Sequence, residues 1–273
     1  MTDNSLDFRA WALARSRRRH PSRWTSDAPE SSLTNRSPDT LWRADFEVHA
    51  DQHANLTTSG MWVLAPVVQV ALAHALPIFQ LGEIGAGRHL LDHAVGVATE
   101  DHLQALRFFI IESQEHARIL ALVCAELEID MLDEHWTERL FRKTRYLRGF
   151  RTEMLAVVIG GMISSQIYET IAVGVGDPTL SRIFGRLHAD ELRHLDFHDA
   201  TLPNHFQKWT PSTRQGVKTI WKIAAMAAAV AVSFEQRSLL RSCASNQRSF
   251  LRSLFRDISK HANTLFGNST SLT

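Results

Sequence analysis

Long stretches of apolar residues at helical spacing constrain the fold of this chain more than any other feature. In each stretch the apolar side chains return every three or four residues, the spacing that places them on one face of a helix. The stretches run from about residue 66 to 97, 99 to 129, 151 to 173, 178 to 202 and 211 to 240. No segment stands out with the alternation of apolar and polar residues that is typical of a strand. The sequence therefore predicts an all-α protein.

Helix start and stop signals divide the chain between these stretches. The segment from Gly174 to Pro178 predicts a helix end and a new start, with Asp177 as the N-cap and Pro178 in the first turn. Pro77 is expected to kink its helix rather than end it. Shorter helices are predicted at about residues 39–52, 132–147 and 246–266.

Length and composition favour one helical domain preceded by an arm. With 273 residues and 44% hydrophobic content, the chain can bury one large core. Residues 1–38 are rich in Arg, Ser, Pro and Asp and lack apolar periodicity, so we expect an irregular arm. Residues 39–273 are predicted to form a single domain, in which short connections favour an antiparallel four-helix bundle at about 60–202. Additional helices, at about 211–266, would complete this domain.

Charge and cysteine content indicate the setting in which the protein works. The formal net charge of +1 gives no general attraction to nucleic acid. Cys124 and Cys243 are the only cysteines and are far apart, so a disulfide framework is disfavoured and a reducing, cytoplasmic setting is expected. The apolar runs at 61–82 and 219–234 are interrupted by polar residues or short, which favours buried helices over membrane spans. Long apolar helices also suit a homodimer.

Candidate metal ligands occur in several of the predicted helices. Glu191 and His194 are three residues apart, so a helix places both on one face, where they could bind one metal ion. Such a pair arises often by chance in a chain with 14 histidines, but Glu83 and His116 lie in other apolar helices and could converge on it. A buried carboxylate without a partner is costly, and a shared ion would remove that cost. Oxygen and nitrogen ligands together suit iron, manganese or zinc.

The helix that contains Glu191 resembles a helix of a known family. The resemblance is carried by four short motifs: Asp177-Pro178, Ile183-Phe184, Asp190-Glu191-Leu192-Arg193-His194 and Phe197-His198. They are similar to the Asp-Glu-x-Arg-His helix of the ferritin-like di-iron carboxylate superfamily, in particular its bacterial oxygenase-type members such as the p-aminobenzoate N-oxygenases. Arg151 to Leu155 and Gly82-Glu83 resemble other helices of this family, and the similarity covers about residues 60–202. It implies a ferritin-like bundle whose non-haem iron, one ion or two, activates oxygen to oxidise a small organic substrate with a separate electron donor.

The resemblance also implies a set of metal ligands, from which this sequence departs at two positions. Four residues fall on ligand positions of the family: Glu83, His116, Glu191 and His194. Ser113 stands where a Glu is expected, and Glu112, one turn before His116, is the carboxylate that could replace it. The ligand expected from the third long helix falls at or beside Gly160-Gly161, which offers no side chain. Glu169, two turns further on, is a weaker substitute.

These departures leave three interpretations of the function open. The favoured one is an iron oxidoreductase, with manganese as the other metal considered, whose altered site is formed by the four matched residues and Glu112. A halogenase-like metal oxidase would use the position vacated by Gly161 for water, a halide, oxygen or substrate. A metal-free binding or scaffold protein would keep the polar groups only as partners of one another. In each case Ser164 and Tyr168, on the same helix face as Gly161, could line a small-molecule cavity.

Overall fold

The computed structural model describes residues 37–49, 62–85, 90–136 and 149–267. Within these ranges the regular structure is entirely helical, which confirms the prediction of an all-α protein. The helices are α2 (Pro38–His49), α3 (Pro66–Gly85), α4 (Leu90–Ala94), α5 (Glu100–Glu126), α7 (Phe150–Gly174), α8 (Pro178–Thr201), the 3-10 helix η2 (Leu202–Phe206), α9 (Pro211–Glu235), α10 (Arg237–Ser242) and α11 (Gln247–Phe266).

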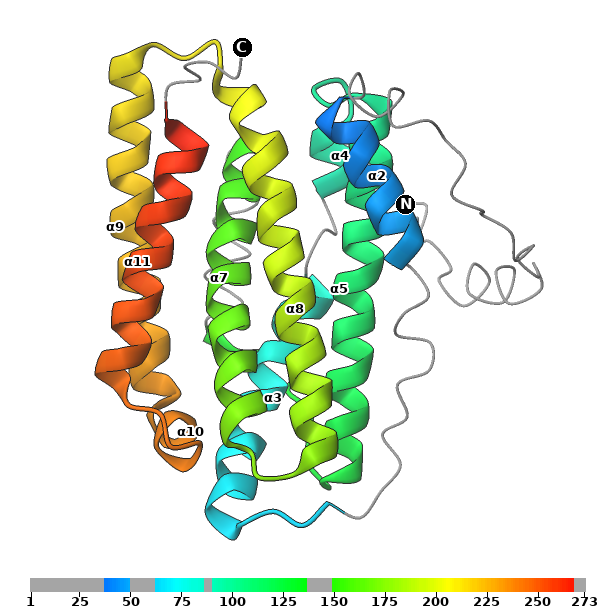
Figure 1. Cartoon of the computed structure of the whole chain (residues 1–273), viewed down its shortest axis with the longest axis vertical. Helices are drawn as coiled ribbons and strands as arrows, with labels where there is room; N and C mark the ends of the chain where they lie inside the picture. The colour runs from blue at the N-terminus through cyan, green and yellow to red at the C-terminus, as the bar shows by residue number, and fades with distance from the viewer. Residues whose placement is uncertain (1–36, 50–61, 86–89, 137–148, 268–273) are drawn as a thin grey trace, which may run out of the picture. The chain divides into compact units, whose positions relative to one another are not determined.

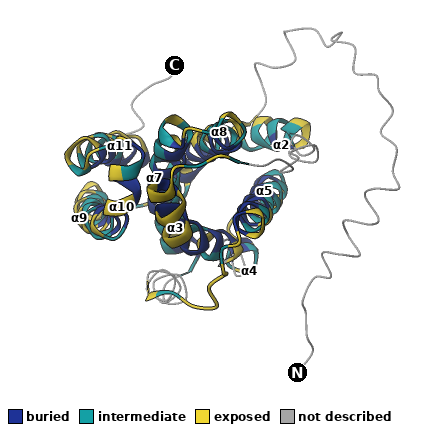
Figure 2. Ribbon diagram, turned by 90° about the horizontal axis from the view of Figure 1, so that it is seen from below, coloured by how far each residue is buried: buried dark blue, intermediate teal, exposed yellow. Residues whose placement is uncertain are grey.

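Four long helices, α3, α5, α7 and α8, lie around a common interior. α7 packs against α8, and α3 packs against α5, while the shorter α2 contacts both α5 and α8 (Figure 1). Seen along the helices, the buried residues of these four helices face inward (Figure 2). The interior contains fully buried apolar side chains such as Leu76, Leu120 and Leu187. The polar residues described below are therefore surrounded by an apolar core.

The predicted turn between α7 and α8 is confirmed. Asp177 is the N-cap of α8, and its side chain accepts hydrogen bonds from the backbone N–H groups of Thr179 and Leu180 at 2.8 and 2.9 Å. Pro178 occupies the first turn, where its missing N–H costs no helical hydrogen bond. Gly176 has a φ of +80°, a conformation that glycine adopts without strain. The turn brings α8 back along α7, so that residues on the two helices can share one site.

Two predicted helices are shorter in the structure than the sequence suggested. The helix expected from 66 to 97 contains Pro77 in its interior as predicted, but it ends at Gly85, and α4 follows as a separate helix. The helix expected from 211 to 240 ends at Glu235, because Gln236 adopts a φ of −89° and a ψ of 17°, outside the α-helical range. α10 then contacts α3 instead of continuing along α9.

Two other predictions concern residues that are mostly outside the described ranges. Of the helix predicted at 132–147, the structure describes residues 132–136, of which only Trp136 is helical. Of the predicted arm at 1–38, it describes only Ser37 and Pro38.

The C-terminal helices cover the side of α7 that faces away from the common interior. α9 and α11 pack against each other, and both contact α7. The indole N–H of Trp221 on α9 donates a hydrogen bond to the backbone carbonyl of Leu155 on α7 at 2.9 Å. α7 thus lies between the four-helix interior on one side and α9 with α11 on the other.

Three helices are long and apolar enough to cross a membrane, judged by length and composition alone. They are Pro66–Ile84, Phe150–Gly174 and Pro211–Glu235. The buried share of their apolar windows falls in that order from 56% to 44% to 28%. α9 therefore has the least buried apolar window of the three, and its exposed apolar side chains include Ile220 and Ile223.

Candidate metal centre

Six acidic or histidine side chains from α3, α5 and α8 meet in the interior. Each is at most 8% exposed, and they are Glu83, Glu112, His116, Asp190, Glu191 and His194. Helical spacing explains why they meet, because residues three or four positions apart on one helix point to the same side. Ionised groups at this depth are costly unless they are paired or bind a metal. Their partners therefore decide what the site can do.

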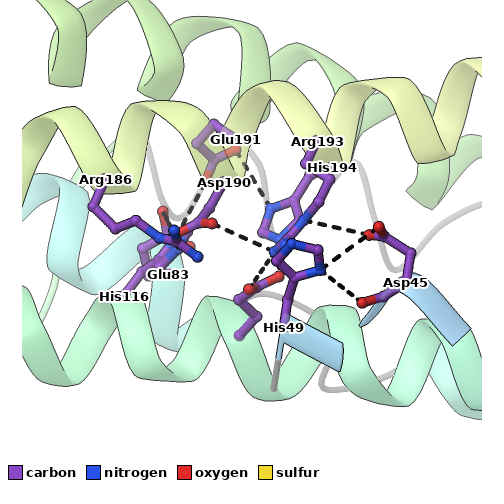
Figure 3. Close-up of polar contacts among 10 residues, drawn as sticks. Asp45, His49, Glu83, His116, Arg186, Asp190, Glu191, Arg193 and His194 are labelled. Atoms are coloured by element: carbon purple, nitrogen blue, oxygen red, sulfur yellow. Dashed lines mark hydrogen bonds and ion pairs between the residues drawn. The ribbon is translucent and has the colours of Figure 1, made fainter. Parts of the chain in front are cut away.

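Glu83, His116 and Glu191 form the first cluster, one residue from each of α3, α5 and α8 (Figure 3). Each offers one ligand atom, and these atoms all lie within 4.8 Å of one another. His116 Nδ1 is 3.3 Å from Glu191 Oε1 and 3.9 Å from Glu83 Oε1. Two ligand atoms bound at ~2.1 Å to one metal are about 3.0–3.4 Å apart, so these separations are close to those of a coordination sphere.

Glu112, Arg193 and His194 form the second cluster, between α5 and α8. The guanidinium of Arg193 donates a hydrogen bond to Glu112 Oε1, and Glu112 Oε2 is 2.8 Å from His194 Nε2. Both oxygens of the carboxylate therefore have close cationic or imidazole partners. Burial acts to lower the pKa of His194, but hydrogen bonds to Glu112 and Glu191 raise it to about 9. In the second cluster the carboxylate of Glu112 is therefore already paired with Arg193 and His194.

Asp190 connects the two clusters. Its Oδ2 is 3.6 Å from His116 Nε2 and 3.2 Å from Arg186 Nε, and its Oδ1 is 3.4 Å from Arg193 Nη2. A carboxylate beside Nε2 orients the imidazole so that Nδ1 faces the other two members of the first cluster. The sequence prediction gave Asp190 no role of its own. The available signal was its position between Arg186 and Arg193, at helical spacings of four and three.

The carboxylates of the first cluster have pKa values shifted in opposite directions. Burial and the charge of Glu191 raise the pKa of Glu83 more than its hydrogen-bond partners lower it. Burial also acts to raise the pKa of Glu191, but hydrogen bonds to His116 and His194 lower it to about 2. Burial acts to lower the pKa of His116, but neighbouring carboxylates hold it well above its usual value. The cluster thus carries a proton on His116 that metal binding would release.

Tyr168 of α7 adds a fourth helix to the first cluster. It is fully buried, and its hydroxyl donates a hydrogen bond to Glu83 Oε1 at 2.9 Å. Burial, followed by the neighbouring carboxylates, raises the pKa of Tyr168 well above its usual value, so the hydroxyl keeps its proton and remains a donor. A hydrogen bond to this oxygen fixes the Glu83 carboxylate and leaves lone pairs for a second partner.

Gly161 of α7 faces the first cluster and lines a cavity. A Cβ atom at this position would lie 3.1 Å from Glu191 Oε2, so the absence of a side chain lets this carboxylate approach α7 closely. Gly160, Gly161 and Ser164 line a cavity of about 140 Å³ that also reaches Glu83 and Glu191. The prediction that this face of α7 lines a cavity is confirmed for Gly161 and Ser164. Tyr168 is not part of the lining.

The structure separates the five predicted metal ligands into two groups. Glu83, His116 and Glu191 come together in the first cluster. Glu112 and His194 pair in the second, but His194 Nδ1 also lies 3.8 Å from Glu191 Oε2 and so contacts the first cluster. Glu169 is exposed on α7, where its carboxylate accepts a hydrogen bond from Gln166. The side chain of Glu169 therefore plays no part in either cluster.

Comparisons of the chain with protein-family models, curated proteins and solved structures find no match. Any assignment of function therefore depends on the geometry of the two clusters and on the sequence resemblance. Both single out the same three residues, Glu83, His116 and Glu191.

Proposed function

We propose that this protein is a non-haem iron oxidoreductase of ferritin-like architecture, which activates oxygen to oxidise a small organic molecule. The observation that carries the proposal is the convergence of Glu83, His116 and Glu191 from three helices, with ligand atoms within 4.8 Å of one another. The sequence resemblance of α8 to the ferritin-like di-iron carboxylate superfamily supports the choice of redox chemistry. An electron donor is required as a partner.

The donor set fits an iron ion. Three points within 4.8 Å of one another all lie within about 2.8 Å of a common centre (4.8 Å divided by √3), against metal–ligand bonds near 2.1 Å. Binding would therefore require side-chain shifts of less than about 1 Å. Two carboxylates and one imidazole suit iron, manganese or zinc, and of these iron fits the proposed redox chemistry. Three protein ligands would also leave positions for oxygen and substrate.

The protein groups around this position have identifiable tasks. Bound iron would supply the one-electron chemistry by which oxygen is activated. Tyr168 holds the Glu83 carboxylate through its hydroxyl, and Asp190 lies beside His116 Nε2, so that both ligands are oriented before a metal arrives. Burial excludes bulk water from the cluster, which protects reactive species from side reactions. Gly161 leaves room for Glu191 beside the cavity in which a substrate can lie.

The second cluster favours one iron over two. A second ion bound by Glu112 and His194 would have to displace Arg193 from the carboxylate, at the cost of a buried ion pair. The halogenase-like interpretation is also less favoured, because Glu191 Oε2 lies only 3.1 Å from the position that a Cβ at Gly161 would take and so narrows the space beside this glycine. A metal-free scaffold is the remaining alternative.

Metal analysis tests the proposal directly. The full chain, produced in medium supplemented with iron and manganese, should contain close to one equivalent of iron per chain. Glu191→Gln should lower the iron content at least tenfold, because it removes a ligand. Glu169→Gln, which changes an exposed carboxylate on α7, should leave the content unchanged. Less than about a tenth of an equivalent of any transition metal in repeated preparations would support the scaffold alternative, and two equivalents would contradict the single-iron site.

A further inference from the structure

The C-terminal helices carry a charge unlike that of the rest of the chain. Residues 211–266, which span α9, α10 and α11, contain nine Lys and Arg residues but only two acidic residues, Glu235 and Asp257. Their formal net charge is therefore +7, whereas the whole chain carries +1 and the remaining residues carry −6. Such an asymmetry indicates that this part of the surface contacts an acidic partner.

Most of this positive charge is exposed and has no acidic partner. Six of the nine basic side chains are exposed: Arg237, Arg241, Arg248, Arg252, Arg256 and Lys260. Of these six, Arg256 alone has a carboxylate within ion-pair distance among the described residues, that of Asp257 at 3.9 Å. Four of them follow one another at intervals of four residues on the solvent side of α11 and form a basic ridge: Arg248, Arg252, Arg256 and Lys260.

α9 presents an uncharged apolar stripe next to the basic ridge. The stripe consists of four exposed residues at successive spacings of three, four and seven, which a helix places on one face: Ile220, Ile223, Ala227 and Phe234. Ile220, Ile223 and Phe234 are 69%, 64% and 56% exposed. α9 and α11 pack against each other on the side of α7 that faces away from the four-helix interior (Figure 2). The stripe and the ridge therefore form one outer surface.

The combination of the two features decides which acidic partner fits. A nucleic acid would neutralise the ridge, but its phosphates gain nothing from exposed Ile and Phe side chains. A second copy of the chain would cover the stripe, but a symmetric contact would bring two units of +7 together. An anionic bilayer accounts for both features, because apolar side chains insert at its headgroup boundary while Lys and Arg attract its phosphates.

We propose that the outer surface of α9 and α11 binds an anionic lipid bilayer, with the stripe inserted at the headgroup boundary and the basic ridge against the lipid phosphates. α9 is long enough to cross a membrane, but its opposite face, with Ala225 and Ala229, is buried in the protein, so the helix lies along the bilayer surface. Ile220 also lines an apolar groove between α9 and α7 that contains Trp209, a residue type typical of membrane interfaces. This binding does not depend on the iron site.

Flotation with lipid vesicles tests the proposal on the full chain. Vesicles of phosphatidylcholine with about one-third phosphatidylglycerol carry the anionic charge, and vesicles of phosphatidylcholine alone are the control without net charge. We expect binding to the anionic vesicles to be stronger by at least about tenfold at about 0.1 M salt, and most of this difference to disappear at about 1 M salt, where charges are screened. Absence of binding to the anionic vesicles would overturn the proposal.

Two double variants separate the contributions of the ridge and the stripe. Arg252→Gln combined with Arg256→Gln should weaken binding to anionic vesicles by about tenfold or more, because each basic side chain near the surface adds to the attraction. Ile223→Ser combined with Phe234→Ser should weaken it by about tenfold as well, because the inserted apolar side chains are removed. Undiminished binding by either double variant would overturn the proposal. If only the serine variant binds like the wild type, the ridge attracts a polyanion such as nucleic acid.

Matched controls change exposed residues of the same kinds on other helices. They are Arg107→Gln with Arg182→Gln, and Val48→Ser with Val173→Ser, and vesicle binding should be unchanged in both. Controls that bind as weakly as the test variants would overturn the proposal. So would a wild-type dimer, measured by light scattering, that the serine variant of α9 converts to a monomer, since the stripe would then be a subunit contact. Metal content of the same preparations reports separately on the iron site.

Discussion

The two buried clusters contain the same kinds of group, yet they differ in readiness for a metal. Each has an imidazole from one helix and carboxylate oxygen from another, at similar depth. In the first, His116 Nδ1 lies 3.3 Å from Glu191 and 3.9 Å from Glu83. These separations are close to those between two ligand atoms of one metal ion. In the second, a carboxylate oxygen is 2.8 Å from His194 Nε2 and the other accepts from Arg193.

One guanidinium accounts for much of this difference. Arg193 neutralises Glu112 and also lies 3.4 Å from Asp190, so the second cluster balances its own charge. The carboxylates of the first cluster have imidazoles rather than a guanidinium as their ion-pair partners: Glu191 lies 3.3 Å from His116 and 3.8 Å from His194, and Glu83 lies 3.9 Å from His116. An imidazole can give up its proton to make room for a metal ion, whereas a guanidinium cannot. A buried group of carboxylates and imidazoles is thus a metal site only where no fixed cation has taken the position of the metal.

Of the variants considered, replacement of Arg193 should have the largest effect on the difference between the two clusters. Arg193→Met removes the cation but keeps much of the apolar stem. Glu112 then keeps its contact with His194, and Asp190 keeps its contacts with Arg186 and His116, but both buried carboxylates lose the guanidinium. We expect a loss of about 2–3 kcal/mol in the free energy of unfolding, because a buried charge-assisted hydrogen bond is lost while other partners remain. Urea unfolding of the metal-free protein at pH 7 measures this loss.

A double variant distinguishes the loss of the guanidinium charge of Arg193 from the loss of packing by its side chain. Arg193→Met combined with Glu112→Gln should recover about 1 kcal/mol relative to Arg193→Met alone, because the carboxylate that lost its guanidinium partner is replaced by an uncharged amide. Added iron should also stabilise Arg193→Met more than the wild type, since the second cluster then resembles the first. If Arg193→Met unfolds within about 1 kcal/mol of the wild type, the ion pair does not explain the difference between the clusters.

The sequence was sufficient to predict the ends of helices where the neighbouring residues carry a start or stop signal. Asp177 and Pro178 are such a signal, because capping depends only on neighbouring residues. The end of α3 also had a signal, the glycines at 82, 85 and 87, which the prediction of one helix from 66 to 97 did not use. The break at Gln236 had none, since the surrounding residues favour helix, and it depends on the packing of α10 against α3.

The site could be predicted only in part, for a similar reason. That Glu83, His116 and Glu191 converge could be predicted from the spacing of residues within helices and from the resemblance of α8 to a known family. The pairing of Arg193 with Glu112 depends on the rotation of α5 relative to α8, which no local pattern determines.

Two neighbouring glycines test how firmly the first cluster holds Glu191. Alanine is about 1 kcal/mol more favourable than glycine inside a helix, so Gly160→Ala, with nothing within 4 Å of the new Cβ, should stabilise the protein by about 0.5–1 kcal/mol. At Gly161 the new Cβ would be 3.1 Å from Glu191 Oε2, and the gain should be cancelled. Urea unfolding of both variants measures the difference, and an equal gain would show that Glu191 moves freely.

The smallest effect is expected at His205, a histidine that lies outside both clusters. Burial, followed by the charges of His102 and Arg151, lowers the pKa of His205 to about 4, with only a weak opposing effect of Asp39. In the unfolded chain the imidazole has its ordinary pKa near 6.5, so between pH 6.5 and 4 the unfolded state binds a proton that the folded state does not. Stability should therefore fall as the pH decreases through this window.

Because His205 is partly exposed, we expect His205→Gln to reduce this fall by only about 0.5 kcal/mol, measured by urea unfolding at pH 7 and pH 4.5. A variant that loses as much stability as the wild type would show that the acid sensitivity originates in other groups, such as the buried His198, whose pKa burial lowers to about 3.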